Sequence, residues 1–185
     1  GIDNKVEGHD NIADGRKNEV KGDLNVATGR TNKIDGKGNL VSGIVNKVKG
    51  KTNIVDGIDN KVEGDNNIAD GRTNEVTGDY NTVDGRTNKV TGKLNVSSGR
   101  SNEINGSNNS VTGIINKTTG EANIVDGIDN KVKGNYNIAD GRTNEVTGDY
   151  NTVNGRKNKV TGKLNVSSGR SNEVNGSNNS VTGII

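Results

Sequence analysis

Hydrophobic and polar positions along this chain repeat with a strict period of seven residues. Glycine occupies every seventh position from Gly1 to Gly183, asparagine follows three residues later, and a small or β-branched residue follows two residues after the asparagine. The unit Gly-x-x-Asn-x-Val-x runs through the chain without an insertion or a deletion. A fixed period of this kind is typical of repeat proteins.

The composition of the unit decides which repeat structure it forms. A coiled coil needs two apolar positions per heptad, and this unit has one that is reliably apolar. Glycine costs about 1 kcal/mol in a helix interior, and collagen requires glycine at every third residue. We therefore predict a β-solenoid. The fourth and sixth residues of each unit lie on the inner face of a short strand, and the fifth lies on the outer face.

Because every coil repeats the same strand, we expect three columns of equivalent residues along the stack of coils. Glycine is expected at the corners, where a positive φ or the close approach of stacked backbones excludes a side chain. Asparagine is expected to form amide ladders from coil to coil, and the sixth residues are expected to stack into a thin apolar core. The first corner glycines are Gly1, Gly8, Gly15, Gly22 and Gly29. The first ladder asparagines are Asn4, Asn11, Asn18, Asn25 and Asn32.

The fifth residue of the unit shows that two heptads make one coil. It is charged in every odd heptad, as at Lys5 and Glu19, and mostly apolar in the even heptads. The predicted fold class is therefore all-β: a parallel β-solenoid, or β-roll, of about 13 coils with 14 residues and two short strands each. From Lys61 to Lys117 the charged column alternates Lys and Glu, which favours one register because opposite charges become neighbours.

The apolar fifth residues form a stripe along one side of the predicted solenoid. Soluble monomers rarely expose a long apolar patch. We therefore expect this stripe to be a self-association face; a flattened core that encloses it is the other possibility. The stripe consists of Ile12, Val26, Leu40, Ile54, Ile68, Val96, Ile124, Ile138 and Val166.

The solenoid is predicted to be continuous over residues 1–185. Three internal blocks, 1–56, 57–126 and 127–185, repeat one pattern, and residues 57–115 differ from residues 127–185 at six positions. Because neither end shows an atypical capping unit, we expect the sequence to be a segment of a longer repetitive chain.

Composition excludes several classes of function. Cysteine is absent and His9 is the only histidine, so we expect no catalytic residues, no metal site, no cofactor and no enzyme activity. A net charge of +2 and three aromatic residues disfavour nucleic-acid binding. No apolar run is long enough for a transmembrane segment. Sequons outside the asparagine ladder, at Asn105, Asn108, Asn175 and Asn178, are glycosylation candidates in a secreted chain.

Even heptads such as Gly64-Asp65-Asn66-Asn67-Ile68-Ala69-Asp70 resemble the head repeat of trimeric autotransporter adhesins. That family has a glycine every seven residues in coils of fourteen. The resemblance implies a left-handed parallel β-roll that trimerises along one apolar strand face. It also implies that Ile12, Val26, Leu40, Ile54 and Ile68 line the trimer axis.

From these observations we expect a structural or adhesive rod segment of a cell-surface or extracellular fibre. Its partners would be copies of itself, as a trimer or a filament, and host-surface or matrix ligands. The alternatives are an ice- or polysaccharide-binding β-solenoid and a viral or phage fibre shaft. Ice binding would favour a regular threonine array, but Asn105, Lys133 and other residues interrupt the array of Thr77, Thr91, Thr147 and Thr161.

Overall fold

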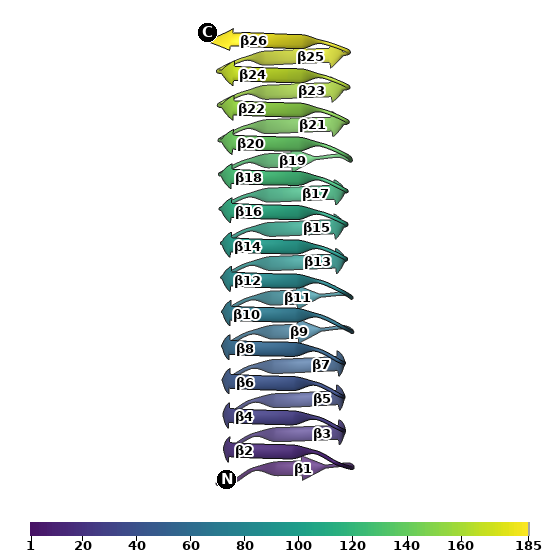
Figure 1. Ribbon diagram of the computed structural model, residues 1–185, viewed down its shortest axis with the longest axis vertical. Helices are drawn as coiled ribbons and strands as arrows, with labels where there is room; N and C mark the ends of the chain where they lie inside the picture. Colours follow the sequence, from purple (N-terminus) through teal and green to yellow (C-terminus); the bar gives the residue numbers. More distant parts are fainter. Residues whose placement is uncertain (185) are drawn as a thin grey trace. The chain divides into compact units, whose positions relative to one another are not determined.

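The computed structural model describes residues 1–184, which form strands and turns without any helix. The fold is an all-β parallel β-solenoid of about 13 coils with two strands per coil, which confirms the predicted fold class. Odd-numbered and even-numbered strands belong to separate sheets and run in opposite directions (Figure 1). The coils group into two compact units, the first Gly1–Lys93 and the second beginning at Leu94, which are described separately.

In the first unit, the odd strands pair in the order β1-β3-β5-β7-β9-β11-β13 and the even strands in the order β2-β4-β6-β8-β10-β12. The odd strands are β1 Lys5–Glu7, β3 Glu19–Asp23, β5 Lys33–Lys37, β7 Lys47–Lys51, β9 Lys61–Glu63, β11 Glu75–Thr77 and β13 Lys89–Lys93. The even strands are β2 Ile12–Arg16, β4 Val26–Arg30, β6 Leu40–Ile44, β8 Ile54–Ile58, β10 Ile68–Arg72 and β12 Thr82–Arg86.

The second unit continues the same alternation, with the sheets β15-β17-β19-β21-β23-β25 and β14-β16-β18-β20-β22-β24-β26. The odd strands are β15 Glu103–Ser107, β17 Lys117–Glu121, β19 Lys131–Lys133, β21 Glu145–Asp149, β23 Lys159–Lys163 and β25 Glu173–Ser177. The even strands are β14 Val96–Arg100, β16 Ser110–Ile114, β18 Ile124–Ile128, β20 Ile138–Arg142, β22 Thr152–Arg156, β24 Val166–Arg170 and β26 Ser180–Ile184.

The sixth residues of the heptads form the core between the two sheets of each unit. Neighbouring strands pair in parallel with an offset of 14 residues, so that Val20 lies opposite Ile34. Both residues are 1% exposed. The core column is polar at three positions, where the hydroxyl oxygens of Ser97, Thr118 and Ser167 are buried without a hydrogen-bond partner.

Each turn between strands is centred on the third residue of the heptad, which adopts a left-handed backbone conformation. Among residues 1–184, twenty-five non-glycine residues have φ between 54° and 63°, and all of them occupy this position. Such values are rare for β-branched residues, yet Thr31 and Val45 adopt them here. Backbone pairing holds the turn in place: the N–H of Thr31 donates to the carbonyl of Arg16 at 2.9 Å, and that of Val45 donates to the carbonyl of Arg30 at 2.9 Å.

The asparagine after each turn completes the hydrogen-bond ladder between coils. The backbone N–H of Asn25 donates to Oδ1 of Asn11, one coil earlier, at 2.9 Å. Its Nδ2 group donates to the same oxygen at 3.1 Å and to the carbonyl of Gly36 at 2.8 Å. The following residue, Val26, resumes the backbone pattern by donating to the carbonyl of Asn39 at 2.8 Å. The side-chain oxygen of asparagine thus replaces the carbonyl that the turn removes from the ladder.

Odd heptads complete the same ladder with a slightly different set of partners. Nδ2 of Asn18 donates to the carbonyls of Asp14 at 2.7 Å and Gly29 at 3.2 Å, while its backbone N–H donates to Oδ1 of Asn4. Asn4 and Asn11 in the first coil are half-buried, whereas Asn18, Asn25 and Asn32 are at most 1% exposed.

The repeating glycines lie before the turns and not at their centres. Gly1 and Gly8 are outside strands, and Gly15, Gly22 and Gly29 are each the fourth residue of a strand. Gly29 has a φ of 101°, and a Cβ there would overlap the carbonyl oxygen of Gly43 in the next coil. Both reasons expected for glycine apply, but the tight bend itself is at the residue two positions later.

Candidate functional site

The even-numbered strands present three outward columns, formed by their first, third and fifth residues. The first column is the predicted apolar stripe, and the chain by itself leaves it uncovered. Ile12 is 58% exposed, Leu40 is 47% exposed and Val26 is half-buried. In the first unit the stripe contains Ile12, Val26, Leu40, Ile54 and Ile68, and in the second unit it contains Val96, Ile124, Ile138 and Val166.

The third and fifth residues of the even strands vary more than the first. The third column of the first unit reads Asp14, Thr28, Ser42, Asp56, Asp70, Asp84. That of the second unit reads Ser98, Thr112, Asp126, Asp140, Asn154, Ser168, Thr182. Every residue of the fifth column is arginine or isoleucine, in runs such as Arg16 and Arg30 followed by Ile44 and Ile58. This face therefore combines apolar, hydroxyl and charged side chains in fixed rows.

In one part of this face in the second unit, neither the first nor the third residues of the strands carry a charge. Parallel pairing places Thr152 opposite Val166 and Val166 opposite Ser180, and it places Asn154 opposite Ser168 and Ser168 opposite Thr182. Five of these side chains are exposed, and Ser168 is half-buried. We call these six residues of β22, β24 and β26 the uncharged patch. All of these side chains are small or β-branched except that of Asn154, so they form two regular rows of short side chains.

The odd-numbered strands carry a different surface, built from charged ladders. Nζ of Lys33 lies 3.1 Å from the Glu19 carboxylate, and Nζ of Lys61 lies 3.2 Å from the Glu75 carboxylate. In the second unit Nζ of Lys117 lies 3.0 Å from the Glu103 carboxylate. Each pair links neighbouring coils, as the alternating charges predict, but exposed pairs contribute only about 0–1 kcal/mol.

A second ladder, at the ends of the odd strands and just beyond them, lowers the pKa values of two aspartates. Oδ1 of Asp79 accepts the backbone N–H of Asp65 at 3.0 Å, and Nζ of Lys93 lies 3.2 Å from Oδ2. The hydrogen bond, followed by the lysine, lowers the pKa of Asp79 below its ordinary value. The pKa of Asp149 is lowered in the same way, first by the backbone N–H of Asn135 and then by Lys163.

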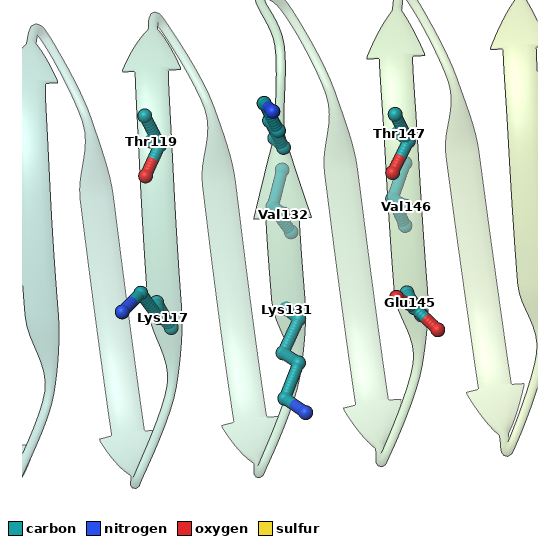
Figure 2. Close-up of a pocket in the computed structure, with 8 residues that line it drawn as sticks. Lys117, Thr119, Lys131, Val132, Glu145, Val146 and Thr147 are labelled. Atoms are coloured by element: carbon teal, nitrogen blue, oxygen red, sulfur yellow. The ribbon is translucent and has the colours of Figure 1, made fainter.

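A shallow hollow of about 180 Å³ lies on the odd face of the second unit. Figure 2 shows Lys117 and Thr119 on one strand, Lys131 on the next, and Glu145 and Thr147 on the third. The strand ribbons cover Val132 and Val146, which lie behind them. The lining is the same lysine, glutamate and threonine set that covers the rest of this face, so the hollow is a local variation of the charged surface.

Residues 1–184 contain no group of three or more acidic, histidine or cysteine side chains placed to hold a metal ion. Within the same residues there is no helix of the length and hydrophobicity that a membrane span requires.

Sequence reasoning missed one column of the candidate face. The threonine array that was considered for ice binding belongs to the odd heptads. The seventh residues of these heptads, such as Thr77 and Thr147, lie on the charged face. The hydroxyl residues that share a face with the apolar stripe are in even heptads, as at Thr112 and Ser168. The available signal was a Ser or Thr two residues after the fifth residue in six of the even heptads, at Thr28, Ser42, Ser98, Thr112, Ser168 and Thr182.

Comparison with known proteins identifies the repeat. A family model described as the grass antifreeze beta roll matches residues 49–141 and 91–184, which together cover more than half of the chain. No curated protein matches the sequence. The β-roll architecture implied by the adhesin resemblance is present, but the family that matches is a different one with the same kind of coil. The chain belongs to the grass antifreeze beta-roll family.

Proposed function

We propose that this protein binds ice through the face of its even-numbered strands. The observation that carries the proposal is the uncharged patch, in which short side chains repeat in two parallel rows at the spacing of the strands. Membership of the antifreeze beta-roll family supports the same function. Neighbouring strands repeat every 4.7–4.9 Å or so, and alternate residues along a strand lie about 6.6–6.8 Å apart.

The physical requirement for an ice-binding face is unusual. Liquid water and ice offer the same hydrogen bonds, so a single polar contact hardly distinguishes them. A rigid surface with a crystal-like repeat gains from many weak contacts that all fit the lattice at once, as multivalent binding does. Short β-branched and hydroxyl side chains suit this role because they are stiff at χ1 and lose little conformational entropy on binding.

The charge distribution favours the even face over the odd face. Lysine and glutamate side chains are long, flexible and strongly hydrated, and they cover the odd strands of both units. On the even face the first column is apolar or carries a hydroxyl group throughout, and the charged third-column residues, such as Asp126 and Asp140, alternate with uncharged stretches. Cations are confined to the fifth column, as at Arg156 and Arg170. We assign the ice contact to the uncharged stretches, of which the uncharged patch is the longest.

The test is a matched pair of substitutions that differ only in the face they alter. Ser168→Arg places a long cation in the middle of the uncharged patch, between Asn154 and Thr182. Thr161→Arg places the same side chain on the odd face, between Thr147 and Asn175. Thermal hysteresis and inhibition of ice recrystallisation should fall severalfold with Ser168→Arg and stay near the unsubstituted value with Thr161→Arg. Equal effects of the two variants, or no thermal hysteresis in the unsubstituted protein, would reject the proposal.

We propose assembly through the apolar stripe as the second candidate function, consistent with a structural or adhesive role outside the cell. The exposure of the stripe supports it, since Ile12 and Ile68 are 58% and 43% exposed. Sedimentation measures this directly: a stable monomer would exclude assembly, whereas an oligomer that Ile12→Asp with Ile68→Asp dissociates would support it. In either role we propose a secreted, non-catalytic protein.

A further inference from the structure

The odd face of the first unit contains a dense group of lysines on β5 and β7. The outward residues of these two strands are Lys33, Asp35, Lys37, Lys47, Lys49 and Lys51, of which five are lysines and one is acidic. We call the five lysines the lysine patch. All of them are exposed.

The register sets like charges directly opposite each other. Lys33 pairs with Lys47 and Lys37 pairs with Lys51 across the two strands, and Lys47 pairs with Lys61 on the following strand. Directly opposed like charges destabilise a sheet, so this arrangement opposes folding. Lys117 and Lys131 repeat this arrangement once in the second unit, whereas Glu75 lies between the oppositely charged Lys61 and Lys89.

The first unit supplies few partners for these cations. Among the ion pairs of the described residues, Lys33 has one, with Glu19, while Lys37, Lys47, Lys49 and Lys51 have none. Asp35 and Glu63 lie opposite Lys49 on its two neighbouring strands, but neither forms an ion pair with it. Four ammonium groups are therefore available to an external anion.

The second unit shows that the fold does not require these lysines. A shift of 70 residues aligns Gly43-Ile44-Val45-Asn46-Lys47 with Gly113-Ile114-Ile115-Asn116-Lys117. At this shift, Lys33, Lys37, Lys49 and Lys51 correspond to Glu103, Ser107, Thr119 and Glu121. There, Glu103 lies opposite Lys117 and forms an ion pair with it. The same coils therefore form with a complementary ladder, and the lysine patch is a specific feature of the first unit.

We propose that the lysine patch is a docking surface for a linear polysaccharide that carries carboxylate groups. Lysines in rows on a flat sheet match an extended polyanion, whose regularly spaced charges can contact several rows at once. The patch has no apolar or aromatic side chain, which a membrane-binding surface would use as an anchor and a single-stranded nucleic acid would use for stacking. The lysine patch is on odd-numbered strands, whereas the proposed ice contact is on even-numbered strands, so the two ligands use different residues.

The test measures binding of the whole protein to polygalacturonate, with neutral dextran as the reference polymer. Lys33→Glu, Lys49→Thr and Lys51→Glu together install the residues that occupy the equivalent positions of the second unit. Arg16→Glu, Lys17→Thr and Arg30→Glu change the net charge by the same amount on the other face and at a turn. Lys37→Ser, which copies Ser107, is a milder second variant.

The unsubstituted protein should bind polygalacturonate, with an affinity that falls steeply as salt is added, and should not bind dextran. The patch variant should weaken binding at least tenfold and Lys37→Ser by a smaller factor, while the charge-matched control should remain within threefold. Equal losses in the patch variant and the control would overturn the proposal, because net charge alone would then explain binding. Tighter binding to phosphatidylserine vesicles than to polygalacturonate would also overturn it.

Discussion

Oδ1 of Asn25 accepts two hydrogen bonds from Asn39, one from its backbone N–H and one from its Nδ2 group, each at 3.0 Å. The Nδ2 group of Asn39 also donates to the carbonyl of Gly50 at 2.8 Å. Both partners are acceptors, so the ladder depends on an amide nitrogen at this place. Asn39→Asp would bring a buried carboxylate against two oxygen atoms.

We expect Asn39→Asp to lower the free energy of unfolding by about 3 kcal/mol, the range for leaving buried polar groups unpaired. Urea denaturation at neutral pH measures this. Asn105→Asp, on the exposed odd face, is the control and should change stability by less than about 0.5 kcal/mol. Equal stability of the two variants would contradict the assigned role of the amide.

Glycine positions should divide sharply into those that tolerate a side chain and those that do not. A Cβ at Gly29 would overlap the Gly43 carbonyl, so Gly29→Ala should lower the free energy of unfolding by about 2–4 kcal/mol. Gly38 occupies a turn with φ of 68°, and its nearest obstacle is Oγ1 of Thr52 at 3.9 Å. Gly38→Asn should therefore be neutral or stabilise by up to ~1 kcal/mol. Thermal melts of both variants test the contrast, and similar losses would refute it.

Replacing the polar residues of the core with apolar ones should stabilise the protein. Thr118 lies between Ile104 and Val132 in the core column, and its hydroxyl oxygen has no partner. Thr118→Val keeps the shape and removes the unpaired hydroxyl, so it should raise the free energy of unfolding by about 1 kcal/mol. Thr119→Val, on the outer face of the same strand, should have little effect. A stability loss at residue 118 would show that its hydroxyl has a partner in solution.

The lowered pKa values of Asp79 and Asp149 predict the behaviour in acid. A carboxylate whose pKa is lower in the folded state than in the unfolded state stabilises the fold above its ordinary pKa of 3.8. This contribution is lost as the pH falls through the lower, folded-state pKa. Asp79→Asn with Asp149→Asn should therefore reduce the loss of stability as the pH falls below the ordinary pKa of 3.8. The amide keeps the acceptor, as Oδ1 of Asn135 does for the backbone N–H of Glu121 at 2.9 Å. Unfolding curves at several pH values measure the slope; an unchanged slope would contradict the assignment.

The inner half of this fold follows directly from the sequence. A period of seven residues with one apolar and one amide position is compatible with few repeat structures. The alternation between charged and apolar residues at Lys5, Ile12 and Glu19 shows that a coil contains two heptads. Strand alternation then places Val20 and Asn18 inside. These predictions succeed because one strict repeat must satisfy every coil at once.

The turn geometry could not be predicted from the sequence, because the repeating glycines point to the wrong position for the bend. Glycine usually marks a positive φ at a tight bend, but here the bend accepts Thr31 and Val45, while Gly29 is needed for close packing against the next coil. A residue such as threonine in a left-handed turn is stabilised by coil-to-coil hydrogen bonds that no local pattern reveals.

The candidate face was only half predictable. The apolar stripe was evident, but its combination with Ser168 and Thr182 depends on which heptads share a sheet. The adhesin resemblance arose because a coil of fourteen residues with two glycines is common to more than one family.

The turns also offer a practical means of attaching probes to this protein. Most side chains at their centres are exposed, including large apolar and aromatic ones: Leu24, Tyr80 and Leu94 are 54%, 59% and 55% exposed. The chain has no cysteine, so Leu24→Cys would create a unique thiol at an edge of the sheets. A fluorophore or a solid support attached there would leave both broad faces uncovered, which would allow adsorption on each face to be observed separately.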